Sequence, residues 1–137
     1  MAVRRGYRAD RTVSARVIIG VVQGPTILFV EDDQPVRAVI TEALSTRGFR
    51  VLTTDSGYEA MQLIAQEHID VLFADIVMRG LNGIELAKQA KALQPDLRII
   101  LATGYYSRAE EARSVGKLLF KPLRVDEVEA EILNLMA

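Results

Sequence analysis

The sequence predicts an α/β fold in which five parallel strands form a doubly wound sheet covered by five helices. Short apolar runs alternate along the chain with helical patterns, as in repeated β-then-α units. The runs at residues 27–30, 71–74 and 99–102 are apolar at every position, which is typical of strands buried on both faces. Right-handed crossovers leave few topologies for such units. A functional site is therefore expected beyond the carboxyl ends of the strands.

Two weaker apolar runs, residues 51–52 and 117–120, are expected to form outer strands. The first helix should begin near Pro35 and end before Gly48, because proline suits the first turn and glycine the position past the end. Its apolar residues fall at helical spacing and predict one buried face: Val36, Val39, Ile40, Ala43 and Leu44.

The remaining helices carry recognisable start and stop signals. Capping boxes or close variants predict three starts: Ser56…Glu59, Asn82…Glu85 and Ser107…Glu110. Pro95 should end the third helix. The last helix should follow Arg124, a poor N-cap, and bury a stripe of four apolar residues: Val125, Val128, Ile132 and Leu135.

The amino-acid composition limits the functions that the chain can have. Of the 137 residues, 50% are hydrophobic and 26% charged, as in a soluble globular domain. The absence of cysteine excludes disulfides, thiolate metal sites and cysteine nucleophiles. Because the chain has only one histidine, His68, a His-rich metal site is excluded. His68 itself is expected to be a loop residue. No apolar run approaches the ~20 residues that span a bilayer, so a cytoplasmic protein without membrane association is expected.

Gly24-Pro25 divides the chain into a basic N-terminal extension, residues 1–25, and a domain, residues 26–137. The extension holds five arginines and one acid, a net charge of +4, whereas the other twelve bases and seventeen acids give −5. An acidic domain argues against direct nucleic-acid binding. The extension is expected to be mobile, with at most a loose strand at residues 17–22, and separable from the domain.

Acidic residues cluster where the strands of the predicted sheet end. Glu31, Asp32 and Asp33 follow the first strand, and Asp75 follows the third. A helix-cap role suits Asp33 and Asp32 but not Asp75, because the next plausible helix start is Asn82. Converging carboxylates repel one another unless a cation lies among them. Oxygen ligands suit a hard divalent ion, usually Mg²⁺ where phosphate is handled.

Four motifs, each at a strand end, together resemble the response regulator receiver domains over residues 26–137. The motifs are Val30-Glu31-Asp32-Asp33, Asp75-Ile76-Val77-Met78 with Asn82-Gly83, Ala102-Thr103-Gly104, and Phe120-Lys121-Pro122. The resemblance implies a flavodoxin-like sheet of order 2-1-3-4-5. The fourth helix should be shortened, because the interval from Thr103 to Lys121 is shorter than is typical of the family.

The resemblance also implies the chemistry, which is that of a stand-alone phosphoacceptor of two-component signalling. Asp75 would take a phosphoryl group from a phosphohistidine. Mg²⁺ would be held by Glu31, Asp32, Asp75 and the backbone carbonyl of Val77. Thr103 would bind a phosphoryl oxygen, and Lys121, before a cis Lys121-Pro122 bond, would pair with Asp75. Phosphoryl transfer depends mainly on positioning and charge neutralisation, which these groups would supply.

The sequence departs from the family pattern around the switch. Arg79 replaces the usual proline four residues after the phosphoacceptor, and Leu118 stands where the family has an aromatic residue. Tyr105 and Tyr106 follow Thr103-Gly104, as in a receiver subgroup where an aromatic in this loop replaces the missing one. The predicted switch is therefore Thr103, Gly104, Tyr105 and Tyr106.

The resemblance implies a sensor histidine kinase or a histidine phosphotransfer protein as donor, and a downstream protein target. The chain should be a monomer or weak dimer that catalyses only its own phosphorylation and dephosphorylation. A phosphorelay intermediate is one alternative. A metal-dependent phosphohydrolase of related fold is another, although such enzymes generally need an acid where Val77 stands. A fixed adaptor without phosphorylation should lack the acceptor, metal acids or lysine, and all are present.

Overall fold

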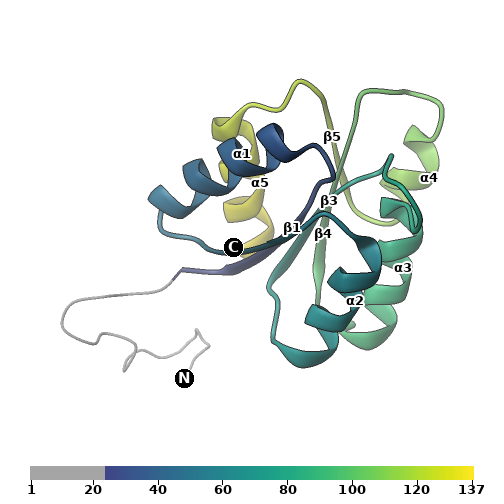
Figure 1. Ribbon diagram of the computed structural model, residues 1–137, viewed down its shortest axis with the longest axis horizontal. Coiled ribbons are helices and arrows are strands. Elements are labelled where there is room, and N and C mark those ends of the chain that lie inside the picture. Colours follow the sequence, from purple (N-terminus) through teal and green to yellow (C-terminus); the bar gives the residue numbers. More distant parts are fainter. Residues whose placement is uncertain (1–23) are drawn as a thin grey trace.

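The computed structural model describes residues 24–137, which form one parallel sheet between two layers of helices (Figure 1). The predicted extension, residues 1–25, lies outside the described residues except for Gly24 and Pro25. The strands pair in the order β2-β1-β3-β4-β5, so the predicted fold, order and outer strands are confirmed. Their bounds are β1 Thr26–Val30, β2 Arg50–Thr54, β3 Val71–Asp75, β4 Arg98–Thr103 and β5 Lys117–Phe120.

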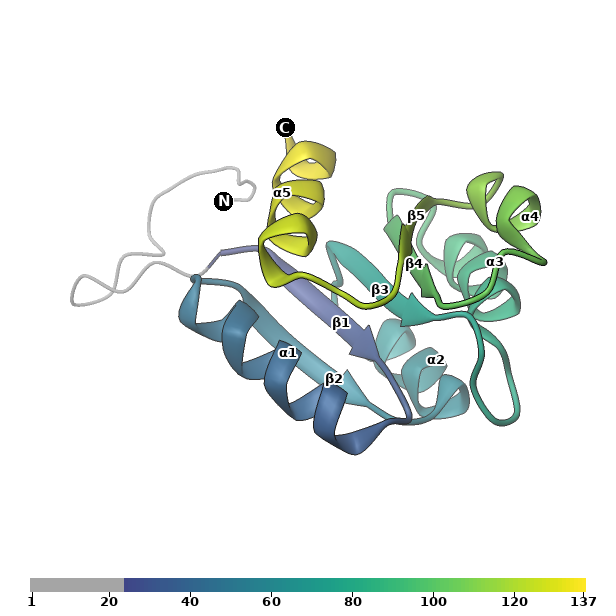
Figure 2. The same cartoon turned by 90° about the horizontal axis from the view of Figure 1, so that it is seen from above.

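The helices divide between the two faces of the sheet. Helices α1 and α5 cover one face, and α2, α3 and α4 cover the other (Figure 1, Figure 2). Their bounds are α1 Gln34–Thr46, α2 Gly57–Gln66, α3 Gly83–Leu93, α4 Ala109–Arg113 and α5 Val125–Met136. The fourth helix has only five residues, as expected. Within residues 24–137, no helix is long and apolar enough to cross a membrane.

Local signals explain three of the five helix starts, whereas α4 and α5 have no side-chain cap bond. Asp33, Ser56 and Asn82 act as N-caps whose side chains accept backbone N–H groups of the first turn. The predicted start at Ser107 is wrong. The N–H of Ala109 donates to the carbonyl of Tyr106, so a tight turn delays the helix, and Arg108 occupies the N-cap position without a side-chain cap bond.

The core lies on both sides of the sheet. The α1–α5 side contains a stacked pair, Phe29 and Phe73, with ring centroids 4.7 Å apart. Ile40 and Leu44 are buried there, but the prediction for Val39 is wrong, since 63% of its surface is exposed. A helix turns about 100° per residue, which places Val39 at the margin of the face centred on Ile40. His68 is exposed in the loop before β3, as expected.

Gly83 lets the start of α3 approach the end of β3. A Cβ at residue 83 would lie 2.3 Å from the carbonyl oxygen of Asp75 and 2.9 Å from the Cα of Ile76. The N–H of Gly83 donates to the carbonyl of Ile76 at 3.0 Å. The glycine is therefore required by close packing against the backbone that carries Asp75.

We predict that Gly83→Ala lowers the free energy of unfolding by about 1–3 kcal/mol, the usual cost of forcing extra volume into a packed site. This loss should occur although alanine favours helices more than glycine does. Gly104→Ala is the matched control, because a Cβ at residue 104 meets nothing within 4 Å. Urea unfolding should find the control within about 0.5 kcal/mol of the parent, or slightly more stable. Equal effects of the two substitutions would contradict the packing role of Gly83.

Candidate functional site

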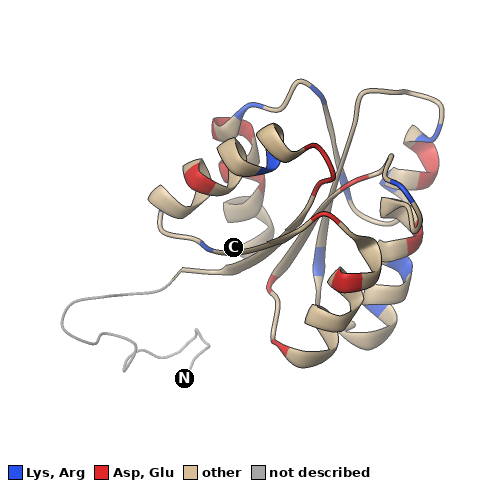
Figure 3. Ribbon diagram, in the orientation of Figure 1, with Lys and Arg blue, Asp and Glu red and all other residues tan. Residues whose placement is uncertain are grey.

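Three carboxylates meet where β1 and β3 end. One oxygen each of Glu31, Asp32 and Asp75 lies within 4.8 Å of the others. Figure 3 shows acidic residues gathered at these strand ends. Glu31 is 1% exposed and Asp75 6% exposed, while Asp32 is half-buried. The structure thus brings together the three acids that the sequence predicts as metal ligands.

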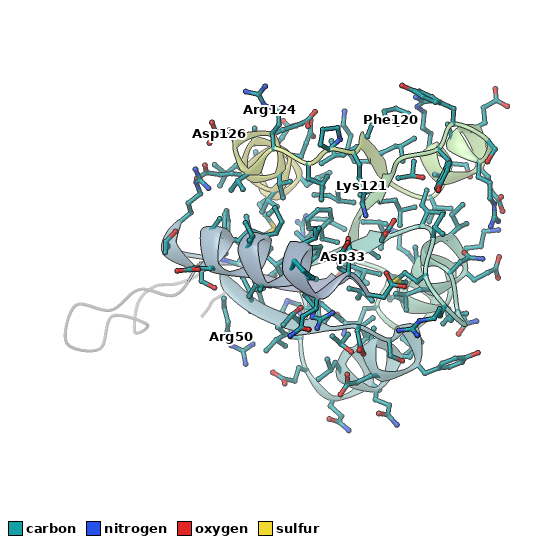
Figure 4. All side chains as sticks on the ribbon, turned by 45° about the horizontal axis from the view of Figure 1, so that its top comes forward. Asp33, Arg50, Phe120, Lys121, Arg124 and Asp126 are labelled. Atoms are coloured by element: carbon teal, nitrogen blue, oxygen red, sulfur yellow. The ribbon has the colours of Figure 1, made fainter. Side chains whose placement is uncertain are left out.

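Lys121 joins two of these acids from the end of β5. Its Nζ donates to Asp75 Oδ2 at 2.8 Å and to Glu31 Oε1 at 3.1 Å. The backbone N–H of Lys121 donates to the carbonyl of Thr103 at 2.8 Å, which fixes the lysine beside β4. The Lys121-Pro122 bond is cis, as expected. Figure 4 shows Lys121 with Phe120 on its α4 side.

The three carboxylates and Lys121 carry an excess of negative charge. Burial raises the pKa of Glu31, and the nearby Asp75 raises it further, although the Asp33 N–H and Lys121 partly offset both effects. Burial alone would lower the pKa of Lys121, but its hydrogen bonds to Asp75 and Glu31 outweigh burial and raise it. One ammonium group therefore faces three carboxylates. Their all-oxygen donor set and excess negative charge fit a hard divalent cation such as Mg²⁺.

Asp75 does not cap a helix, because α3 begins only at Gly83. The loop that follows Asp75 is anchored by the N–H of Ile76, which donates to the carbonyl of Ala102 at 2.9 Å. The N–H of Val77 donates to Asp75 Oδ1 at 3.3 Å. The backbone of Val77 therefore lies beside Asp75, and its side chain is exposed.

Thr103 ends β4 beside the cluster and is buried. Its Oγ1 accepts the backbone N–H of Tyr105 at 3.0 Å, so the hydroxyl is tied to the following loop. Gly104, Tyr105 and Tyr106 are exposed in that loop. The hydroxyl hydrogen of Thr103 stays available to donate to another acceptor.

Phe120 is a residue that sequence reasoning missed. The Tyr106 ring stacks on the Phe120 ring with centroids 4.6 Å apart and an interplanar angle of 28°. The Arg113 guanidinium carbon lies 5.7 Å from the same centroid. Phe120 pairs in register with Thr103 across β4 and β5. Strand alternation from Leu118 puts Phe120 on the same face of the sheet, and that signal could have identified it.

Comparison with known proteins identifies relatives among the response regulators. The family profile described as "Response regulator receiver domain" matches residues 27–133. The response regulator receiver protein CpdR of Brucella abortus is 34% identical over 80% of this chain and 95% of its own length. Sporulation initiation phosphotransferase F of Bacillus subtilis is 27% identical over 74% and 86%. For response regulators named MprA, from mycobacteria, the identity is 32% and the chain spans about half their length.

Solved structures of response regulators and their receiver domains are also similar to this chain. The receiver domain of the hybrid histidine kinase CckA is 28% identical, with a TM-score of 0.72 over 82% of this chain and 99% of that one. The response regulator TrrA of Thermotoga maritima, solved in complex with Mg²⁺ and beryllium fluoride, is 26% identical. Its TM-score is 0.76, again over 82% and 99%.

We predict that Asp75→Asn raises the stability of the metal-free protein by about 1 kcal/mol. Removing one of three like charges relieves repulsion at an effective dielectric constant of about 20, while the asparagine oxygen still accepts from Lys121. Mg²⁺ should stabilise the parent by roughly 2.7 kcal/mol at 100 times its dissociation constant, and the variant much less. Thermal unfolding with and without millimolar Mg²⁺ measures both effects. Indifference of the parent to Mg²⁺, together with an unchanged variant, would refute the cluster as a cation site.

Proposed function

The chain belongs to the response regulator receiver family, and on that premise we propose that it accepts a phosphoryl group from a phosphohistidine on Asp75. The observation that carries the proposal is the setting of Asp75. It is a buried carboxylate at a strand end, 2.8 Å from the ammonium group of Lys121 and beside two further acids. Such a group can act as a nucleophile without serving as a helix cap.

In the proposed step an Asp75 carboxylate oxygen attacks the phosphorus in line with the phosphorus–nitrogen bond of the donor. That bond breaks, and the imidazole leaves with its electron pair and takes up a proton. Lys121 pairs with the carboxylate and then with the phosphoryl oxygens, and the Thr103 hydroxyl donates to one of them. These groups act by positioning and electrostatic stabilisation.

Mg²⁺ is the proposed cofactor. The residues that would hold it are Glu31, Asp32 and Asp75, with the backbone carbonyl of Val77 added by family resemblance. Bound there, the ion supplies positive charge to the phosphoryl oxygens. The oxygen donor set of the cluster supports this choice, as does the complex of TrrA with Mg²⁺ and beryllium fluoride.

The phosphoryl group is proposed to act on the loop after Thr103. Phosphorylation adds negative charge and acceptor oxygens beside the threonine hydroxyl. If Thr103 moves inward so that its hydroxyl reaches the phosphate, Oγ1 moves away from the Tyr105 N–H and their hydrogen bond breaks. The segment from Gly104 to Tyr106 is then freed, and Tyr106 leaves or changes its stack on Phe120. Phosphorylation thereby shifts the loop and α4 between two states that a partner distinguishes.

The proposed partners are a sensor histidine kinase or a histidine phosphotransfer protein as donor, and a protein target that reads the switched surface, all in the cytoplasm. A role as a phosphorelay intermediate is a second candidate, because one relative is named a phosphotransferase. A phosphohydrolase is disfavoured, because an exposed valine, Val77, occupies the position where such enzymes generally carry an acid.

We predict that Asp75→Asn abolishes labelling by acetyl phosphate or by a phosphorylated kinase in the presence of Mg²⁺. The acyl phosphate requires a carboxylate, which asparagine lacks. Asp33→Asn is the matched control, since Asp33 caps α1 and asparagine caps as well. The control should label at nearly the parent rate. Undiminished labelling of the Asp75 variant, followed by radioactive phosphate or intact mass, would refute the assignment.

We also predict that Tyr106→Ala and Phe120→Ala each uncouple phosphorylation from readout. Both should leave the phosphorylation rate and Mg²⁺ affinity within about twofold of the parent, because neither residue touches the acids. Both should remove the difference in target affinity between the phosphorylated and free forms, and the difference in amide hydrogen exchange over residues 104–113. If Leu118→Ala has this effect while the other two are silent, the stack is an ordinary surface contact.

A further inference from the structure

Arg37 ties together the turn between β1 and α1. It lies one turn into α1 and is half-buried. Its Nη1 donates to the backbone carbonyl of Glu31 at 2.7 Å, and its backbone N–H donates to the carbonyl of Asp33 at 2.9 Å. One residue therefore holds the backbone at both ends of the turn. No sequence pattern signals this contact, because it depends on how the turn folds back onto the helix.

Asp32, in the middle of this turn, lacks the anchors that its neighbour Glu31 has. The N–H of Glu31 donates to the carbonyl of Thr54 at 3.1 Å, Glu31 Oε1 accepts from Lys121, and Glu31 Oε2 accepts the N–H of Asp33. Among the residues that the structure describes, none makes a hydrogen bond or ion pair with the Asp32 side chain. The direction of the Asp32 carboxylate therefore depends on its backbone.

The Glu31 carbonyl belongs to the peptide unit that joins Glu31 to Asp32. A peptide unit is planar, so holding its oxygen fixes the orientation of the whole plane and with it the backbone that enters Asp32. A strand-end carbonyl without a partner would turn toward solvent. A charged donor is suited to this task, because a hydrogen bond from an ionised group is stronger than one between neutral groups.

We propose that Arg37 is a positioning residue for the cation site, which aims the Asp32 carboxylate into the cluster by holding the Glu31 carbonyl. The inference rests on the proposed function, because it assigns Asp32 to the site that holds Mg²⁺. Groups that orient metal ligands without touching the metal commonly change its affinity by 10–100-fold when they are removed.

The positive charge of Arg37 predicts an effect of opposite sign. A cation beside a cation site repels the ion, so a purely electrostatic role means that Mg²⁺ binds more tightly once the charge is removed. A positioning role means that Mg²⁺ binds more weakly despite the lost repulsion. The sign of the change therefore separates the two roles.

The experiment compares three variants of the full chain by calorimetric titration with MgCl₂. Arg37→Met keeps an unbranched apolar stem but removes the charge and the donor, whereas Arg37→Lys keeps a positive charge and a donor. Arg47→Met is the matched control at the other end of α1, where Arg47 pairs with Asp126 at 3.0 Å and Glu129 at 3.2 Å. Arg37→Met should weaken Mg²⁺ binding by about tenfold, Arg37→Lys should restore most of the loss, and Arg47→Met should bind like the parent.

Unchanged or tighter binding by Arg37→Met overturns the proposal, and so does a lysine variant that binds no better than the methionine variant. Equal weakening by Arg47→Met overturns it too, because the effect would then follow helix stability. Amide hydrogen exchange of the metal-free proteins gives an independent readout. Asp33, whose N–H bonds Glu31 Oε2, should exchange at least threefold faster in Arg37→Met than in the parent, and an unchanged rate overturns the proposal. If the parent binds no Mg²⁺, the proposed function fails, and this exchange still decides the role of Arg37.

Discussion

A single ammonium group, that of Lys121, contacts both buried carboxylates of a three-acid cluster, and much of the structure serves to hold that arrangement. The parallel sheet brings the ends of β1, β3 and β5 to one edge. Gly83 lets α3 pack against the backbone of Asp75, and the turn after β1 presents Glu31 and Asp32 together. Burial disfavours the charged form of Glu31 and raises the pKa of its carboxyl group. A site with excess negative charge is suited to bind a cation, which supports the proposed role of Mg²⁺.

The loop after Thr103 and helix α4 are held less firmly than the acid cluster. Helix α4 has five residues and no side-chain cap bond, and only Ala109 and Ala112 of its residues are buried. Arg108 and Lys88 pair with the exposed Glu111, and the hydrogen bond from Arg108 lowers the pKa of that carboxyl. Exposed ion pairs of this kind contribute little stability. A short helix without a side-chain cap opens at low free-energy cost, and this supports our proposal that α4 and the loop before it form the two-state element.

Sequence patterns predicted the features that depend on local residues and strand ends. Continuous apolar runs predicted the buried strands, and the acids that follow them predicted the cluster, because parallel strands end at one edge. The features that were predicted wrongly or not predicted depend on tertiary contacts. The start of α4 follows a turn at Tyr106 rather than the Ser107 signal, and Val39 lies outside the packed face. The stack on Phe120, at the end of β5, is made by Tyr106 from the loop after β4.

The most direct test of the account is a crystal structure grown with Mg²⁺ and beryllium fluoride, the pair of ligands present in the TrrA complex. The account predicts electron density for beryllium fluoride on Asp75 and for a metal ion among Glu31, Asp32 and Asp75. It also predicts that Thr103 Oγ1 has left the Tyr105 N–H and donates to a fluorine atom. A metal ion bound elsewhere, or an occupied Asp75 with the bond between Thr103 and Tyr105 intact, would contradict it.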